Sequence, residues 1–169
     1  VLYGSLSDRY GLASLAAQNT ISSTTVSEET GANTNTTAPT VSKVPNFTVT
    51  DTNGDLVDLY NFLGKPVILN FWASWCGPCR SEMPDIQKAY ETYGEDIHFL
   101  IVNLTDGSRE TVKAATDYIP TAGYTFPIYF DTTQIAAASY GAYSIPTTYF
   151  IGAEGQPIAR FVGAMSADP

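Results

Sequence analysis

The fold is decided by residues 67–84, VILNFWASWCGPCRSEMP. The stretch opens on an apolar run, Val67–Phe71, which is typical of a strand buried on both faces of a sheet. In the segment Arg80–Tyr93, apolar side chains then recur every three or four residues, as they do along one side of a helix. The two cysteines, Cys76 and Cys79, are therefore predicted to lie where a central strand turns into a helix.

A helix start gives these two thiols distinct chemistry. Unpaired N–H groups and the positive end of the helix dipole stabilise a thiolate there, which lowers the pKa of the thiol. The two intervening residues, Gly77 and Pro78, let the sulfurs meet across one turn, and a proline is tolerated in a first turn because its missing N–H has no partner there. We predict that Cys76, nearer the surface, is the nucleophile and that Cys79 resolves the mixed disulfide.

Two other interpretations of the cysteine pair are weaker. A zinc site needs four ligands, but the chain has only two cysteines and one histidine, His98, which lies in an apolar strand-like run. A purely structural disulfide would close a very short loop and would constrain the unfolded chain little. We therefore predict a redox-active pair with no metal and no other cofactor.

Composition separates an N-terminal arm from one globular domain. Of the 23 residues in Thr20–Ser42, 12 are serine or threonine, so this segment is predicted to be a linker. Before it, Val1–Ala17 has apolar residues at roughly helical spacing and predicts a short amphipathic helix. The expected division is an arm and linker at 1–43 and a domain at 44–169.

The net charge of the chain, its apolar runs and its first residue indicate which partners it can bind and where in the cell it acts. The net charge of −9 argues against nucleic-acid partners and against an anionic membrane surface. No apolar run reaches the roughly 18 residues of a membrane span. Because the chain opens on Val1 and not on methionine, we expect a mature form or an expressed fragment, and a signal or anchor before Val1 is compatible with it.

The rest of the chain alternates strand and helix signals, which predicts an α/β fold with a mixed sheet and helices on both faces. The helix at 108–119 is expected to end at Pro120 and to be capped by Asp106 or Ser108, and Asn53-Gly54 predicts a hairpin turn. The expected strands are 47–50, 56–58, 67–71, 97–104, 127–130, 148–151 and 157–162, and the expected helices are 59–63, 80–93, 108–119 and 132–140.

Residues 71–80, FWASWCGPCR, resemble the active site of the thioredoxin superfamily. Several further segments are similar to its TlpA/ResA-like branch of extracytoplasmic thiol-disulfide oxidoreductases. The resemblance runs from about Val44 to Met165 and implies a thioredoxin-like three-layer fold with an N-terminal β-hairpin and the helical insertion of that branch. The segments that carry the branch resemblance are 46–49, 64–70, 80–84, 123–127 and 145–148.

The same resemblance assigns roles to residues far from the cysteines. It implies that Pro146 is cis and packs against the pair, and that the backbone of Ile145 pairs with an extended client segment. It places Trp75 on the surface as a groove wall. From the residues alone, a loop proline before a strand such as Pro146 is most often only a turn, and Trp75 could be a core side chain.

Two departures from the family pattern concern proton transfer. Thioredoxin has a buried aspartate where this chain has Asn70, and some ResA-like proteins have a glutamate where this chain has Gly77. The nearest remaining acid is Glu82, three residues past Cys79. We favour a solvated carboxylate on the helix surface over a proton-relay role for Glu82.

The leading hypothesis is a reductase of disulfides in exported client proteins, re-reduced by a membrane electron donor and tethered outside the cytoplasm through a segment before Val1. The resemblance suggests apocytochrome c or another exported protein as client. The alternatives are dithiol oxidation in oxidative folding, a binding module without turnover, and a peroxidase. The last is disfavoured because Ala73 stands where peroxiredoxins have threonine or serine.

The C-terminus departs from the family in a different way. Thioredoxin-like domains end in a helix packed on the sheet, whereas this chain stops soon after Ser166, a plausible N-cap. The strand Pro157–Val162 would then leave apolar side chains uncovered. We expect either that the given sequence is truncated or, less favoured, that Val1–Ala17 covers this face.

Overall fold

The computed structural model describes residues 42–166. They form a seven-stranded sheet in the order β2-β1-β5-β4-β3-β6-β7, with parallel and antiparallel pairs. The elements are β1 (Thr48–Thr50), β2 (Leu56–Asp58), the 3-10 helix η2 (Leu59–Phe62), β3 (Val67–Trp72), α2 (Gly77–Tyr93), β4 (His98–Asn103), α3 (Val112–Thr121), β5 (Ile128–Phe130), α4 (Ile135–Tyr140), β6 (Thr147–Ile151) and β7 (Pro157–Val162).

The strand that the sequence predicted most clearly, β3, lies in the interior of the sheet, between β4 and β6. β3 pairs in parallel with β4, from Val67 opposite His98 to Trp72 opposite Asn103, and antiparallel with β6 on its other side. Every β3 residue except the half-buried Ile68 is buried. A strand with neighbours on both edges and helices on both faces must be apolar nearly throughout, and this explains why Asn70 is the one polar residue of β3.

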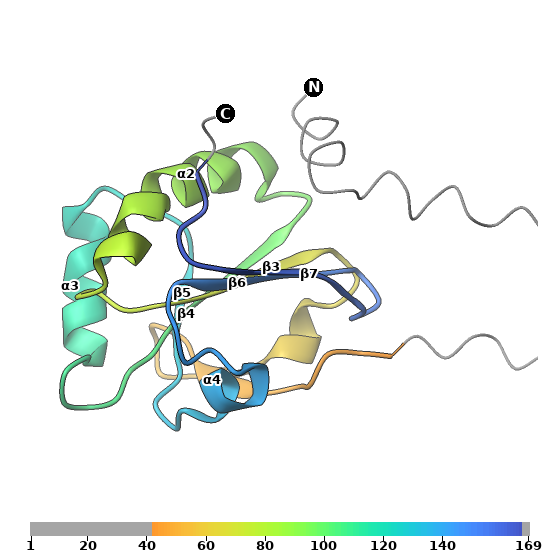
Figure 1. Ribbon diagram of the computed structural model, residues 1–169, viewed down its shortest axis with the longest axis horizontal. Helices are drawn as coiled ribbons and strands as arrows, with labels where there is room; N and C mark the ends of the chain where they lie inside the picture. The colour runs from red at the N-terminus through yellow and green to blue at the C-terminus, as the bar shows by residue number, and fades with distance from the viewer. Residues whose placement is uncertain (1–41, 167–169) are drawn as a thin grey trace, which may run out of the picture. The chain divides into compact units, whose positions relative to one another are not determined.

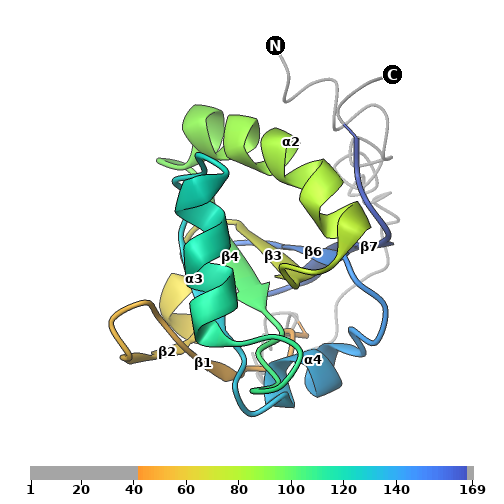
Figure 2. The same ribbon diagram turned by 90° about the vertical axis from the view of Figure 1, so that its left-hand side faces the viewer.

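Helices cover both faces of the sheet, as Figures 1 and 2 show. On one face α2 and α3 enclose a core that includes Met83 and Ile101. On the other face α4 and the segment around η2 enclose a second core that includes Leu59, Phe71 and Tyr140. The predicted thioredoxin-like three-layer fold is confirmed.

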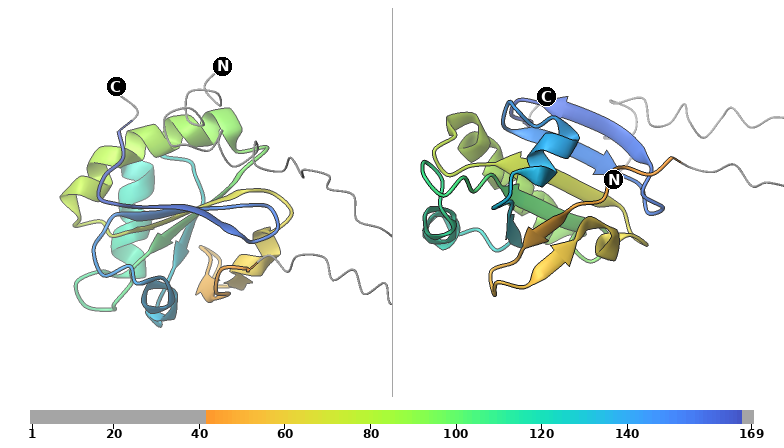
Figure 3. Two further views of the ribbon diagram at one scale, coloured as in Figure 1. Left: turned by 45° about the vertical axis from the view of Figure 1, so that its right-hand side comes forward. Right: turned by 90° about the horizontal axis from the view of Figure 1, so that it is seen from below.

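The N-terminal hairpin forms at the predicted turn. The Asp51 carboxylate accepts hydrogen bonds from the backbone N–H groups of Asn53, at 2.8 Å, and Asp55, at 2.9 Å. Gly54 adopts φ +91°, a conformation that other residues rarely take. The hairpin extends the sheet because Thr50 of β1 pairs with Phe130 of β5, and Figure 3 shows it along one edge.

The bounds predicted for the helix at 108–119 were wrong. α3 begins four residues later, and its N-cap is Thr111, whose hydroxyl accepts the Ala114 N–H at 3.1 Å. Asp106 instead accepts the N–H groups of Ser108 and Glu110, so it organises the preceding loop and not the helix. The helix also continues through Pro120 to Thr121.

The helix expected at 132–140 is shorter than predicted. α4 starts at Ile135, because Gln134 has a left-handed backbone with φ +60° that cannot belong to a helix. The Asp131 carboxylate accepts the Ala137 N–H at 2.8 Å and so ties the start of α4 to the end of β5. Residues 132–134 therefore form a connection and not the first helical turn.

The last strand, β7, lies at an edge of the sheet and confirms the predicted range. Its side chains are exposed or half-buried throughout, with Ile158 and Val162 among the exposed ones. Val1–Ala17, the less favoured of the two explanations considered for the uncovered face of this strand, and nearly all of the predicted arm 1–43 lie outside the described residues. Among the helices of residues 42–166, none combines the length and apolarity needed to cross a membrane.

Candidate active site

Cys76 is the N-cap residue of α2. Its backbone is extended, and its Sγ accepts a hydrogen bond from the Cys79 N–H at 3.2 Å, as the side chain of an N-cap residue does. Gly77 and Pro78 form the start of the helix, where the absent proline N–H costs no hydrogen bond. The predicted junction of strand, loop and helix is confirmed, and it places both sulfurs against the positive end of the helix dipole.

The two cysteines are joined as a disulfide and differ in burial. Cys79 is fully buried, whereas Cys76 is 4% exposed and is followed by the exposed Gly77 and Pro78. Trp75, directly before Cys76, is 43% exposed and lies on the surface. The side of the disulfide that faces solvent is therefore that of Cys76.

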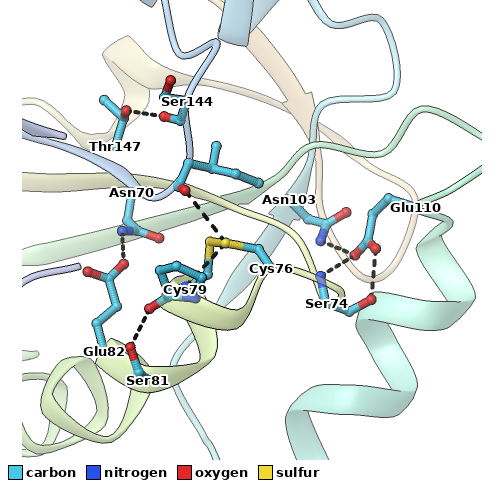
Figure 4. Close-up of a disulfide and its surroundings, with 12 residues drawn as sticks. Asn70, Ser74, Cys76, Cys79, Ser81, Glu82, Asn103, Glu110, Ser144 and Thr147 are labelled. Atoms are coloured by element: carbon cyan, nitrogen blue, oxygen red, sulfur yellow. Dashed lines mark hydrogen bonds between the residues drawn. A yellow bond between two sulfur atoms is a disulfide. The ribbon is translucent and has the colours of Figure 1, made fainter. Parts of the chain in front are cut away.

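A loop before β6 closes the site from the opposite side. The Ile145–Pro146 bond is cis, as the resemblance implied. The Ile145 carbonyl oxygen lies 3.6 Å from the Cys76 Sγ (Figure 4), and the Pro146 carbonyl accepts the Gly163 N–H at 2.8 Å. A backbone acceptor thus lies directly beside the more exposed sulfur.

The floor of the site holds a buried carboxylate, and our favoured interpretation of Glu82 as solvated was wrong. Glu82 is only 1% exposed, because its place one turn after Cys79 puts it on the inward side of α2. It accepts hydrogen bonds from Asn70 Nδ2 at 2.8 Å and from the Met165 N–H at 3.0 Å. Burial raises the pKa of Glu82, partly opposed by these two hydrogen bonds.

Asn70 links this carboxylate to the sheet. Its Nδ2 also donates to the Thr148 hydroxyl at 2.9 Å, while its buried Oδ1 has no partner among the described residues. Asn70 and the Thr148 hydroxyl do not titrate, so among these three side chains Glu82 is the group that can exchange a proton. Figure 4 shows Asn70 and Glu82 together below the loop that precedes β6.

A second buried carboxylate, which the sequence interpretation missed, braces the active-site loop. Glu110 is fully buried and accepts the backbone N–H and the hydroxyl of Ser74 at 2.8 and 2.7 Å, and Asn103 Nδ2 at 2.6 Å. Next to it, the Arg109 guanidinium lies 3.5 Å from the centre of the Trp75 ring. Residues 108–111, Ser-Arg-Glu-Thr, belong to a polar loop, and no pattern in this part of the sequence indicates either contact.

The histidine is not part of this site. His98 begins β4, and its ring packs edge-on against Phe62 at a centroid distance of 5.5 Å. Burial and the charge of Lys65 lower its pKa. Residues 42–166 contain no group of three or more histidine, cysteine or acidic side chains arranged to hold a metal ion.

Comparison with known protein families matches residues 41–157 to the AhpC/TSA family. The chain belongs to this family. It is 33% identical over 126 residues to the thiol-disulfide oxidoreductase ResA of Bacillus anthracis, an alignment that covers 75% of this chain and 71% of the relative. ResA of Bacillus subtilis is 32% identical over 126 residues, and with these homologues this AhpC/TSA protein is a ResA-like thiol-disulfide oxidoreductase.

Solved structures support the same placement of this AhpC/TSA protein. StoA from Bacillus subtilis superimposes with a TM-score of 0.63 at 29% identity, over 73% of this chain and 91% of StoA. The exposed lipoprotein thioredoxin of Streptococcus pneumoniae gives a TM-score of 0.63 at 29% identity, over 72% of this chain and 92% of the relative. The chemistry of the site is therefore thiol-disulfide exchange at Cys76 and Cys79.

Proposed function

We propose that the protein reduces disulfides of exported client proteins, with Cys76 as nucleophile and Cys79 as resolving thiol. The observation that carries the assignment of these two roles is the difference in position and burial between Cys76 and Cys79. Cys76 lies at the N-cap beside exposed residues, and Cys79 is fully buried one turn into the helix. The N-cap position stabilises a thiolate, and only a sulfur near solvent is reached by a folded client.

The reaction has two exchange steps. The Cys76 thiolate attacks one sulfur of the client disulfide, whose S–S bond breaks, and the other client sulfur leaves as a thiolate that takes a proton. The Cys79 thiolate then attacks the Cys76 sulfur and releases the second client sulfur. Two electrons have passed from the pair to the client, and the Cys76–Cys79 disulfide remains.

Cys79 must lose its proton before the second step, and we assign the acceptor role to Glu82. Its buried carboxylate lies on the inward side of α2, one turn after Cys79, and burial raises its pKa toward the range of an effective base. Asn70 and the Met165 N–H hold the carboxylate in place.

The client is proposed to bind in an extended conformation across the exposed sulfur. The Ile145 backbone, 3.6 Å from the Cys76 Sγ, and the cis Pro146 form one wall. Trp75 forms the other wall, with Gly77 and Pro78 at the rim. Backbone pairing of this kind is tolerant of client sequence.

We further propose that the protein acts outside the cytoplasm and receives electrons from a membrane donor, tethered by a segment before Val1. The relative from Streptococcus pneumoniae is an exposed lipoprotein, and another, from Mycobacterium tuberculosis, is a secreted disulfide oxidoreductase. A long Ser/Thr-rich stretch before the domain suits a tether. Apocytochrome c remains one client class to test.

The direction of electron flow is tested by the reduction potential of the pair against glutathione. A value near −270 mV, similar to thioredoxin, supports a reductant, and a value near −120 mV supports the alternative, dithiol oxidation in oxidative folding. Insulin reduction in the presence of dithiothreitol tests turnover, and Cys76→Ser combined with Cys79→Ser is expected to abolish it. Turnover that survives the double substitution would exclude a dithiol mechanism.

Two further experiments test the roles of the cysteines. Limited alkylation at mildly acidic pH is expected to label Cys76 before Cys79. A Cys79→Ser variant is expected to hold a client on Cys76 as a mixed disulfide. Preferential labelling of Cys79 would reverse the roles, and rapid peroxide consumption by the reduced protein would favour a peroxidase.

A further inference from the structure

An arginine lies over the ring of the tryptophan that precedes the nucleophile. The Arg109 guanidinium carbon is 3.5 Å from the centre of the Trp75 ring, which is contact distance for a stacked pair. Both side chains are exposed, Trp75 by 43%. A guanidinium stacked in this way keeps its N–H donors at its edge, in the plane where a carboxylate is bound.

The loop that carries this arginine is fixed to the active-site loop. Glu110, the next residue, accepts the N–H and the hydroxyl of Ser74, two residues before Cys76. Asp106 accepts the Ser108 and Glu110 N–H groups at 2.7 and 2.9 Å and so holds the turn before α3. The guanidinium therefore has a defined position relative to Cys76.

A second arginine lies on the same flank of the redox pair. Arg80, directly after Cys79, is exposed, and its guanidinium carbon is 5.4 Å from the ring centre of Tyr118 on α3. Within residues 42–166, no hydrogen bond or ion pair engages the side chain of Arg80 or Arg109, whereas Arg160 donates to the Gly141 carbonyl. Both arginines by the site thus keep donors free.

The acidic groups nearest to the pair accept hydrogen bonds from other protein donors. Glu82 and Glu110 are buried, and hydrogen bonds from protein donors occupy both carboxylates. Asp106 is exposed and close enough to Arg109 for its pKa to be lowered by that charge, but its Oδ1 is already occupied by two backbone N–H groups. The opposite wall, residues 141–148, contains no charged side chain.

We propose that Arg109 and Arg80 select client segments that carry carboxylate side chains next to the reactive cysteine. This inference rests on the proposed function, in which a client segment lies across Cys76. An arginine binds a carboxylate through two parallel hydrogen bonds, so the pair favours acidic residues on the α3 flank of the bound segment. The net charge of −9 would by itself disfavour acidic clients, and any preference for them must come from a local contact.

Disulfide-linked peptides of equal length test the proposal. Each peptide carries a fluorescent reporter released by reduction, and the residues on either side of its cysteine are glutamate, glutamine or lysine. For the native protein at low salt, kcat/KM for the glutamate peptide is expected to exceed that for the lysine peptide about fivefold, the size of one or two exposed charge pairs. The ratio should shrink toward one in high salt, because exposed charges are screened.

Variants assign the preference to the arginines. Arg109→Gln should reduce the ratio of the two kcat/KM values, and Arg109→Glu should reverse it. Arg109→Lys keeps the charge and should keep the preference for the glutamate peptide. A variant that only damaged the structure would not show this dependence on charge. Lys113→Gln is the matched control, since Lys113 is an exposed cation of α3 already paired with Asp117 at 2.5 Å, and it should leave the ratio unchanged.

The outcomes separate this inference from the proposed function. Equal turnover of all three peptides by the native protein, or a preference unaltered in the combined Arg80→Glu and Arg109→Glu variant, would overturn the charge selection and leave the oxidoreductase intact. Absence of turnover with every peptide would overturn the proposed function itself. Thermal unfolding of each variant identifies any that fails to fold, and Arg109→Lys then carries the test.

Discussion

Two buried carboxylates flank the redox pair, and they are held in different ways. Glu110, beside the loop that carries Ser74, receives three hydrogen bonds, two of them from side-chain groups and one from a backbone N–H. Glu82, on the floor near Cys79, receives two, from Asn70 and Met165. Figure 4 shows both carboxylates around the disulfide.

The difference in hydrogen bonding indicates a structural role for Glu110 and a reactive role for Glu82. Every donor of Glu110 belongs to the loop before Cys76 or to the end of β4, so this carboxylate joins two segments of the chain. Glu82 has fewer donors, and burial raises its pKa, so its charge is less well supported. We therefore expect Glu110 to matter mainly for stability and Glu82 mainly for rate.

The largest expected effect is on stability, from Glu110→Ala. The change leaves the Ser74 N–H and Asn103 Nδ2 without an acceptor in a buried site, and the free energy of unfolding should fall by about 3 kcal/mol. Urea unfolding measures it. Glu154→Ala, at an exposed turn, is the control and should change little. If Glu110→Ala lowers the free energy of unfolding no more than the control does, the structural role of Glu110 would be contradicted.

The next effect is on rate, from Glu82→Gln. The substitution removes the proposed proton acceptor while keeping nearly the same volume, so release of client from a Cys76 mixed disulfide should slow by about 10²-fold near neutral pH. Stopped-flow measurement of that single step, over a range of pH, isolates it. Glu91→Gln, an exposed glutamate of the same helix, should have no effect. An unchanged rate and pH profile would remove Glu82 from the mechanism.

Ser74→Ala should have a smaller effect on stability. It removes one hydrogen bond to Glu110 and keeps the bond from the Ser74 backbone N–H. The expected loss in free energy of unfolding is about 1 kcal/mol, measured by urea unfolding as above. If Ser74 and Glu110 stabilise the fold through their mutual hydrogen bonds, the double variant Ser74→Ala, Glu110→Ala should lose less free energy of unfolding than the two single losses added together. Strict additivity would argue against it.

The smallest expected effect is a difference in the pH dependence of stability. Because the pKa of Glu82 is raised in the folded chain, that chain binds this proton more tightly than the unfolded chain does. The contribution of Glu82 is therefore greatest below its ordinary pKa of about 4.5 and is lost as pH rises through the raised value. Relative to Glu82→Gln, the native protein should lose stability over that window.

Urea unfolding at several pH values, compared between the two proteins, checks this difference. Asp51 and Asp106 have lowered pKa values, mainly because backbone N–H groups donate to them, and they act in the opposite direction. Their contributions are common to both proteins and cancel in the comparison. A difference with the reverse slope would mean that the folded chain stabilises the ionised form of Glu82.

Local sequence was sufficient for most of the fold. The largely apolar run of Val67–Phe71, the Asn53-Gly54 turn and the cysteine pair at the start of a helix are each visible as short sequence patterns, and each prediction was confirmed. The bounds of α3 and α4 were not predicted correctly. Thr111 and Gln134 set those bounds, and polar loop residues before a helix offer several capping choices that sequence alone does not rank.

The chemistry of the site could be predicted from the sequence, because two thiols stand between a buried strand and a helix in a chain with no other comparable metal-binding or nucleophilic cluster. The environment of those thiols could not be predicted, because it depends on long-range contacts. Glu82 contacts Asn70 and Met165, and Glu110 contacts Ser74, across separations of 12, 83 and 36 residues. Burial and pKa depend on such distant contacts, and no local pattern records them.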